Sequence, residues 1–230
     1  MVVAAAGDDD ARSAPLGPST DNALVAEALV HLGYPEEGAV SILAPFVQLV
    51  RTWSRRMNLT GARTDRDLVD VLLTDAIVLA RQHWLPQGGS FVDVGSGGGT
   101  PAIPLLLLRS DLRGTLVEPL RKRVTFLRTC AGQLGLSNRM KVIEGRIDPD
   151  TPQLADAPFD VALSRATFEP ETWLRIGSSL APRTVVFVGS ERSPDLPDPQ
   201  DRTRYNLPFG GSPRELRLFD RALDTPTPVP

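Results

Sequence analysis

A glycine-rich stretch between two apolar segments places the strongest constraint on the fold of this chain. The segment from Phe91 to Val94 is short and rich in strand-forming residues, and glycines follow at positions 95, 97, 98 and 99. A second apolar run, residues 102–108, comes directly afterwards. Glycine permits backbone with positive φ and close approach of a ligand, and the first N–H groups of the next helix lack intrahelical acceptors. The pattern predicts a strand, a tight turn and a helix that hold a nucleotide-like cofactor.

The spacing of the glycines discriminates between cofactors. The dinucleotide fingerprint G-x-G-x-x-G would require glycine at position 100, where this chain has Thr100. Asp93 stands two residues before Gly95, and its carboxylate suits a cofactor with an ammonium and a sulfonium charge but would repel a pyrophosphate. The pattern resembles the first motif of Rossmann-like methyltransferases that use S-adenosylmethionine (SAM). A dinucleotide site and a glycine turn without a ligand are the alternatives.

The composition is that of a globular protein and narrows the chemistry. Of 230 residues 41% are hydrophobic, and no apolar run approaches the ~20 residues of a membrane span. The net charge of −3 argues against general nucleic-acid binding by the whole chain, although a local basic face remains open. One cysteine and two histidines disfavour a disulfide or a Cys/His metal site. We expect a cytoplasmic protein without a secretory signal or a membrane segment.

Strand and helix patterns alternate through the second half of the chain. The predicted strands are residues 91–94, 114–118, 140–144, 159–164 and 184–188, followed by a hairpin of 203–208 and 215–220. Helical patterns separate the strands, which indicates a parallel sheet with right-handed crossovers. The sequence therefore predicts an α/β fold of the Rossmann-like class over residues 86–220, with a mostly parallel seven-stranded sheet and a C-terminal antiparallel hairpin.

The first part of the chain reads as a helical extension. Residues 23–85 contain three amphipathic helices, and the third begins at Thr64, with Asp67 at the capping-box position. Residues 1–22 and 221–230 are rich in small, polar and proline residues, and we predict that both are disordered tails.

Polar groups stand at the predicted carboxyl ends of the strands, where an open α/β sheet binds its ligand. Glu118 lies 21 residues after Gly97, a spacing that suits acceptance of hydrogen bonds from ribose hydroxyls. Asp148 could face an adenine amino group, or serve as ordinary turn chemistry before Pro149. Arg165 could bind a carboxylate or phosphate as a fork, or form a structural ion pair.

Five segments in the same order resemble one methyltransferase family. They are residues 57–60 (MNLT), 93–105 (DVGSGGGTPAIPL), 116–127 (LVEPLRKRVTFL), 145–148 (GRID) and 163–166 (LSRA). With these segments the chain resembles the RsmG/GidB family, the SAM-dependent guanine-N7 methyltransferases of bacterial small-subunit ribosomal RNA. The match runs from about residue 40 to residue 220.

The resemblance implies a cofactor, a partner and site residues. SAM would be the cofactor, and 16S ribosomal RNA or the 30S particle would be the partner of a monomeric enzyme. By resemblance, Gly95 and Thr100 would contact SAM at the first loop, Ile147 and Asp148 would hold its adenine side, and Arg165 would lie after the fourth strand. Asp93, Gly97 and Glu118 complete the predicted cofactor site. No catalytic side chain is expected, because N7 of guanine has an in-plane lone pair and loses no proton before attack.

Departures from the family pattern leave the acceptor open. Val71 and Leu72 stand where the family has an Arg-His pair, Asp75 is kept, Ala76 replaces a serine, and Val188 stands where a lysine is common. A methyltransferase with another acceptor, such as a small molecule, is therefore one alternative. A SAM- or RNA-binding module without activity is another. Among the basic residues, Arg51, Arg55 and Arg63 are candidates to replace the missing polar groups.

Overall fold

The computed structural model describes residues 18–35, 37–189 and 195–221. In these ranges six helices and seven strands follow one another. The helices are α1 (Pro18–His31), α2 (Ala39–Ser54), α3 (Asp65–Ala80), α4 (Ala102–Leu108), α5 (Arg121–Gln133) and α6 (Pro170–Leu180). The strands are β1 (Ser90–Val94), β2 (Arg113–Glu118), β3 (Met140–Glu144), β4 (Val161–Ser164), β5 (Arg183–Val188), β6 (Asp201–Asn206) and β7 (Pro213–Asp220).

The seven described strands form one sheet in the order β3-β2-β1-β4-β5-β7-β6. The first five in this order pair in parallel, whereas β7 runs antiparallel to β5 and β6 runs antiparallel to β7. The predicted fold class is therefore confirmed, including the terminal hairpin. The strand order reverses between β1 and β4, which is the switch point where such sheets bind ligands.

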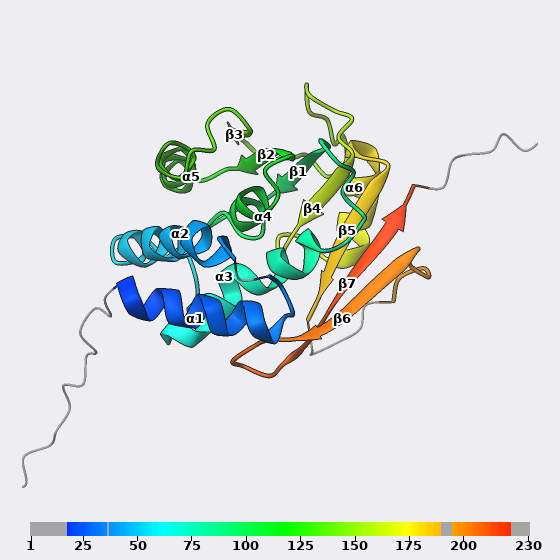
Figure 1. The fold of residues 1–230 in the computed structure, drawn as a ribbon. Coiled ribbons are helices and arrows are strands. Elements are labelled where there is room, and N and C mark those ends of the chain that lie inside the picture. The colour runs from blue at the N-terminus through cyan, green and yellow to red at the C-terminus, as the bar shows by residue number, and fades with distance from the viewer. Residues whose placement is uncertain (1–17, 36, 190–194, 222–230) are drawn as a thin grey trace, which may run out of the picture.

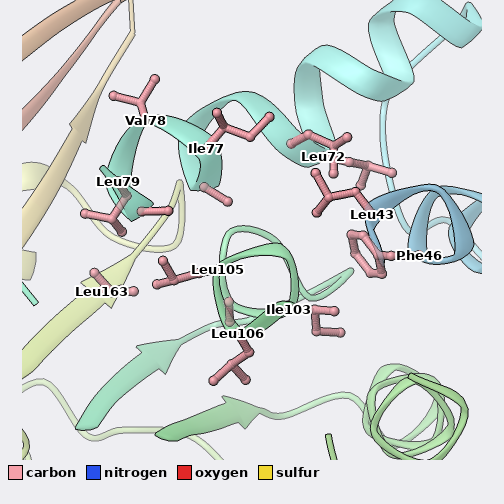
Figure 2. Packing of buried hydrophobic residues seen from close by; sticks show 14 of the residues in the cluster. Leu43, Phe46, Leu72, Ile77, Val78, Leu79, Ile103, Leu105, Leu106 and Leu163 are labelled. Carbon is pink, nitrogen blue, oxygen red and sulfur yellow. The ribbon is translucent and has the colours of Figure 1, made fainter. Parts of the chain in front are cut away.

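The helices cover the two faces of the sheet unequally. Helix α4 packs on β2, and α2 and α3 pack in turn on α4, so the N-terminal helices form an outer layer on this face (Figure 1). Helix α6 packs on β4 and β5. One buried hydrophobic cluster joins three of these helices (Figure 2). It includes Leu43 and Phe46 of α2, Leu72 of α3, and Ile103 and Leu105 of α4. The predicted boundary near residue 85 therefore falls between elements that share a core.

Helix α1 begins earlier than predicted. It starts at Pro18, so residues 18–22 are helical and do not belong to a disordered tail; residues 1–17 and 222–230 of the predicted tails lie outside the described residues. Asp21 in its first turn is 1% exposed and pairs with Arg51 of α2. This tertiary ion pair gives the first turn a partner that the local composition does not reveal.

The N-terminus of α3 follows the predicted capping chemistry. The Thr64 hydroxyl accepts a hydrogen bond from the Asp67 N–H at 3.1 Å, and the Asp67 carboxylate accepts one from the Thr64 N–H at 3.2 Å. Both groups satisfy N–H donors that the first turn leaves free. None of the helices in the described ranges is long and apolar enough to cross a membrane.

Candidate cofactor site at the carboxyl edge of the sheet

The glycine turn after β1 is held by its neighbours on three sides. Gly95 has φ +79° and its N–H donates to the Val117 carbonyl at 2.8 Å. A Cβ at position 95 would lie 2.1 Å from the Thr167 hydroxyl oxygen, and one at Gly98 would lie 3.0 Å from the Leu59 carbonyl oxygen. Glycine is required at 95 by both the backbone conformation and the close approach of the loop after β4.

Glu118 at the end of β2 locks the turn in place. Its side chain is 1% exposed, and its two carboxylate oxygens accept hydrogen bonds from the Gly97 N–H at 2.8 Å and the Leu120 N–H at 2.9 Å. Each oxygen keeps a lone pair, so the carboxylate can still accept a ligand hydroxyl. The sequence predicted a ligand contact for Glu118, and the structure shows that this side chain also supports the loop.

Asp93 near the end of β1 is a buried acid, and one of its carboxyl oxygens has no hydrogen-bond partner. It is 1% exposed, and the unpartnered oxygen is Oδ2. Burial raises the pKa of Asp93 to about 7, with Glu118 adding to the rise while the Ser96 hydroxyl and Arg165 oppose it. A cation placed beside this carboxylate would return it to the ionised form.

Arg165 after β4 is part of a network that reaches across the sheet edge. Its Nη1 donates to the Asp75 carboxylate at 3.0 Å and to the Val71 carbonyl at 2.8 Å. Asp75 is 4% exposed, and its other oxygen accepts a hydrogen bond from the Tyr205 hydroxyl at 2.7 Å. Burial and the adjacent Asp75 charge raise the pKa of Tyr205, which therefore stays a neutral donor. Arg165 is thus fixed by a structural ion pair, one of the two predicted roles.

The turn, the end of β2 and the loops after β3 and β4 enclose an apolar pocket of about 350 Å³. Of the predicted site residues, Gly95 and Ile147 line it. The other lining residues were not among the predicted site residues, although several lie in the segments that resemble the family. They are Val94, Val117, Pro119, Gly145, Arg146, Pro149, Thr167 and Phe168. The Phe168 ring also stacks on Trp173, with 6.1 Å between ring centroids. No local motif marks Phe168, because only the fold brings it opposite Ile147.

Two predicted residues have their polar groups engaged elsewhere. The Asp148 carboxylate accepts hydrogen bonds from the Asp150 N–H at 2.9 Å and the Thr151 hydroxyl at 3.0 Å. The Asp150 N–H is the main cause of the lowered pKa of Asp148, and the residue does not line the pocket. The Thr100 hydroxyl donates to the Leu72 carbonyl at 2.8 Å, so it ties the glycine turn to α3.

Basic residues near the site fall into two groups. Arg51 pairs with Asp21 and Asp65, so its charge is already matched within the fold. Arg55 and Arg63 are exposed. The described structure therefore leaves two of the three predicted replacement cations available to an outside partner.

Three of the four positions that depart from the family pattern, Val71, Leu72 and Ala76, lie in α3, and the fourth, Val188, ends β5. Leu72 and Ala76 are buried in the core, at 1% and 0% exposure, and Val71 is half-buried. The backbone carbonyls of Val71 and Leu72 accept hydrogen bonds from Arg165 and Thr100. In this part of α3 the backbone, and not the side chains of these two residues, makes the polar contacts with the site.

Known proteins are similar to this chain over most of its length. A family model described as "GidB: rRNA small subunit methyltransferase G" matches residues 39–188. The ribosomal RNA small subunit methyltransferase G of Anaeromyxobacter dehalogenans is 32% identical over 173 residues, which cover 74% of this chain and 79% of the relative. Its namesake from Yersinia pseudotuberculosis is 38% identical over 124 residues, which cover 54% of this chain and 57% of the relative.

Solved structures share the fold at low identity. The O-methyltransferase of Bacillus cereus, solved in complex with SAH, has a TM-score of 0.52 and 16% identity, covering 77% of this chain and 91% of its own. The methyltransferase SibL in its apo form has a TM-score of 0.50 and 15% identity, covering 78% and 74%. These likenesses concern the fold, whereas the family model and the first relative concern descent. The chain belongs to the GidB family, that of ribosomal RNA small subunit methyltransferase G.

Proposed function

We propose that this protein transfers a methyl group from SAM to N7 of a guanine in 16S ribosomal RNA. The observation that carries the proposal is the pocket of about 350 Å³ at the switch point, walled by the glycine turn and the loops after β2, β3 and β4. Pockets that are mostly apolar with a few convergent polar groups are typical binding sites for cofactors of this size. Relatives that carry the name of a small-subunit ribosomal RNA methyltransferase supply the class of acceptor.

The residues present fit SAM group by group. Ile147 and Phe168 offer apolar walls for the adenine, and Asp148 follows Ile147 along the chain without lining the pocket. Glu118 has lone pairs for the ribose hydroxyls, and Gly95 with Gly97 lets the ligand approach the turn.

The charged end of SAM fits the other part of the site. Asp93 presents an unpartnered buried oxygen that suits the ammonium group. Arg165 suits the carboxylate and Thr100 holds the turn. SAM, when bound, supplies an electrophilic methyl group on its sulfonium.

For methyl transfer to N7, the protein has to position the two reactants but does not have to transfer a proton. N7 of guanine attacks through an existing lone pair, so no general base is needed. The glycine turn, whose Gly97 N–H is bound by Glu118, would position the cofactor, and Asp75 holds Arg165 in an ion pair. Such preorganisation lowers the entropic part of the barrier to in-line transfer.

A second candidate is methyl transfer to an acceptor other than RNA. It is favoured by the apolar side chains of Val71, Leu72 and Ala76, which stand where the family pattern has polar residues. Under the first proposal, Arg55 and Arg63 with other exposed cations contact the RNA. We further propose that the enzyme is monomeric and acts in the cytoplasm, where ribosomal subunits are made.

One experiment separates the two candidates. The protein is incubated with methyl-labelled SAM and 30S particles or 16S RNA that lack the modification, and the product is cleaved chemically at N7-methylguanine. We expect label in the RNA and a single cleavage position. Clear SAM binding without transfer to RNA, together with turnover on a small acceptor, would favour the second candidate.

A further inference from the structure

The terminal hairpin carries a second pocket, separate from the cofactor site. It has a volume of about 450 Å³ and lies between the end of β5, the end of β6 and the start of β7. Three arginines line it, Arg204, Arg214 and Arg217, against one carboxylate, Glu215. Glu215 accepts hydrogen bonds from Arg204 Nε at 2.8 Å and from Arg217 Nε at 2.6 Å. The lining therefore carries an excess of positive charge.

Arg214 is the arginine of this pocket that Glu215 does not hold. Its Nε is buried without a hydrogen-bond partner, and within the described ranges its guanidinium makes no ion pair. Its Nη1 lies 3.9 Å from the place that a Cβ on Gly189 would occupy, at the end of β5. A partly buried guanidinium without a partner is costly, and an anion with paired oxygens would satisfy it.

The pocket lies at the same edge of the sheet as the cofactor site. Val186 of β5 is paired with Ser164, the last residue of β4, so Val188 and Gly189 extend beyond that level. The neighbouring strand spacing of about 4.8 Å places β7 roughly 10 Å from β4. Tyr205 lines the pocket and donates to Asp75, which in turn holds Arg165. An extended ligand that enters the cofactor edge at Arg165 would reach Arg214 next.

We propose that this pocket binds a phosphodiester group of the RNA acceptor close to the target nucleotide, with Arg214 as the principal contact. The inference rests on the proposed RNA substrate. A planar guanidinium matches two phosphate oxygens, and the surplus positive charge suits a polyanion. The carboxylate of SAM is the other anion in the reaction, but the pocket that fits SAM lies on the far side of β5, around β1, β2 and β4.

The test compares Arg214→Met with Arg221→Met in the full chain. Arg221 is exposed directly after the other end of β7, and its backbone N–H, not its side chain, bonds Pro182. Binding of unmethylated 16S RNA is measured over a range of salt concentrations, and SAM binding is measured by calorimetry. For Arg214→Met we expect RNA affinity about five- to tenfold lower and a salt slope smaller by about 1. SAM affinity should stay within about twofold, and Arg221→Met should match the wild type.

Other variants and outcomes keep the inference decidable. Arg214→Gln removes the charge but keeps a polar side chain, and it should show the same smaller salt slope of RNA binding if Arg214→Met fails to fold. Arg214→Lys keeps the charge and should retain the wild-type salt slope. An unchanged slope in the folded neutral variants, or a loss of SAM affinity in place of RNA affinity, overturns the phosphate assignment. A wild type that binds RNA in an Arg214-dependent way without methylating it would refute the proposed function alone. A wild type that binds no RNA would refute both.

Discussion

At the scale of single residues, the Glu118 carboxylate holds the glycine turn and is the proposed acceptor for the ribose hydroxyls. Its oxygens accept N–H groups of Gly97 and Leu120 while it is 1% exposed. Because an amide NH2 cannot accept, Glu118→Gln leaves one N–H facing a donor. We expect a loss of about 1–3 kcal/mol in unfolding free energy, measured in urea, and weaker SAM binding by calorimetry. Glu144 lies opposite Glu118 in the register of β3 with β2, but its side chain is exposed. Glu144→Gln should therefore change neither the unfolding free energy nor SAM binding.

Asp93 predicts a pH dependence of cofactor binding. Its pKa is raised to about 7 by burial, so it is mostly protonated at pH 6 and increasingly ionised above pH 7. A cationic ligand pairs with the ionised form, so SAM affinity should rise roughly fivefold to tenfold from pH 6 to pH 7.5. Asp93→Asn should bind SAM more weakly and lose this dependence. A wild-type affinity that is flat over the same range would remove Asp93 from the ammonium site.

At the scale of elements, the turn between β1 and α4 depends on the loop after β4. Gly95 and Gly88 both have positive φ, but an added Cβ meets Thr167 at position 95 and nothing within 4 Å at position 88. Gly88→Ala should cost only the backbone strain of about 1–2 kcal/mol and leave SAM binding intact. We expect Gly95→Ala to lower the melting temperature further and SAM affinity at least about tenfold. Equal effects of the two substitutions would show that the Thr167 contact is unimportant.

At the scale of the whole molecule, Asp75 joins three distant parts of the chain: α3, the loop after β4 and strand β6. Asp75→Ala removes the acceptor of both Arg165 and Tyr205, and we expect a loss of about 2–3 kcal/mol, moderated because the Arg165 side chain is 23% exposed. Tyr205→Phe should cost about 1 kcal/mol. The double variant should cost little more than Asp75→Ala alone, since the hydroxyl has then lost its partner. Additive losses in urea unfolding would mean that the hydrogen bond contributes nothing.

Helix α3 also holds the turn of the terminal hairpin. The Asp70 carboxylate of α3 accepts hydrogen bonds from the Phe209 and Gly210 N–H groups, and Arg66 lies 4.6 Å from the centroid of the Phe209 ring. The turn between β6 and β7 is therefore fastened to α3 (Figure 1). Through this attachment and Asp75, the N-terminal helices help to place Arg214 and Arg165 at one edge.

The sequence by itself determined the features that depend on local pattern. Alternating strand and helix periodicity predicted the α/β fold, the glycines after residue 94 predicted the turn, and the Thr64–Asp67 spacing predicted the start of α3. Glu118 was predicted at the site because residues at the carboxyl ends of parallel strands gather at one edge, whereas Ile147 was predicted from the family resemblance. Each of these inferences needs only neighbours along the chain, whose spacing the sequence records directly.

Tertiary structure decided the features that depend on distant partners. Arg165 meets Asp75 across 90 positions and Tyr205 meets Asp75 across 130, so no spacing rule connects them. Asp21 in the first turn of α1 forms an ion pair with Arg51 of α2. The position of Arg214 beside Gly189 at the end of β5 depends on the antiparallel pairing of β7 with β5. Burial, charge pairing and close approach act through space, and the order of residues along the chain does not state which of them will meet.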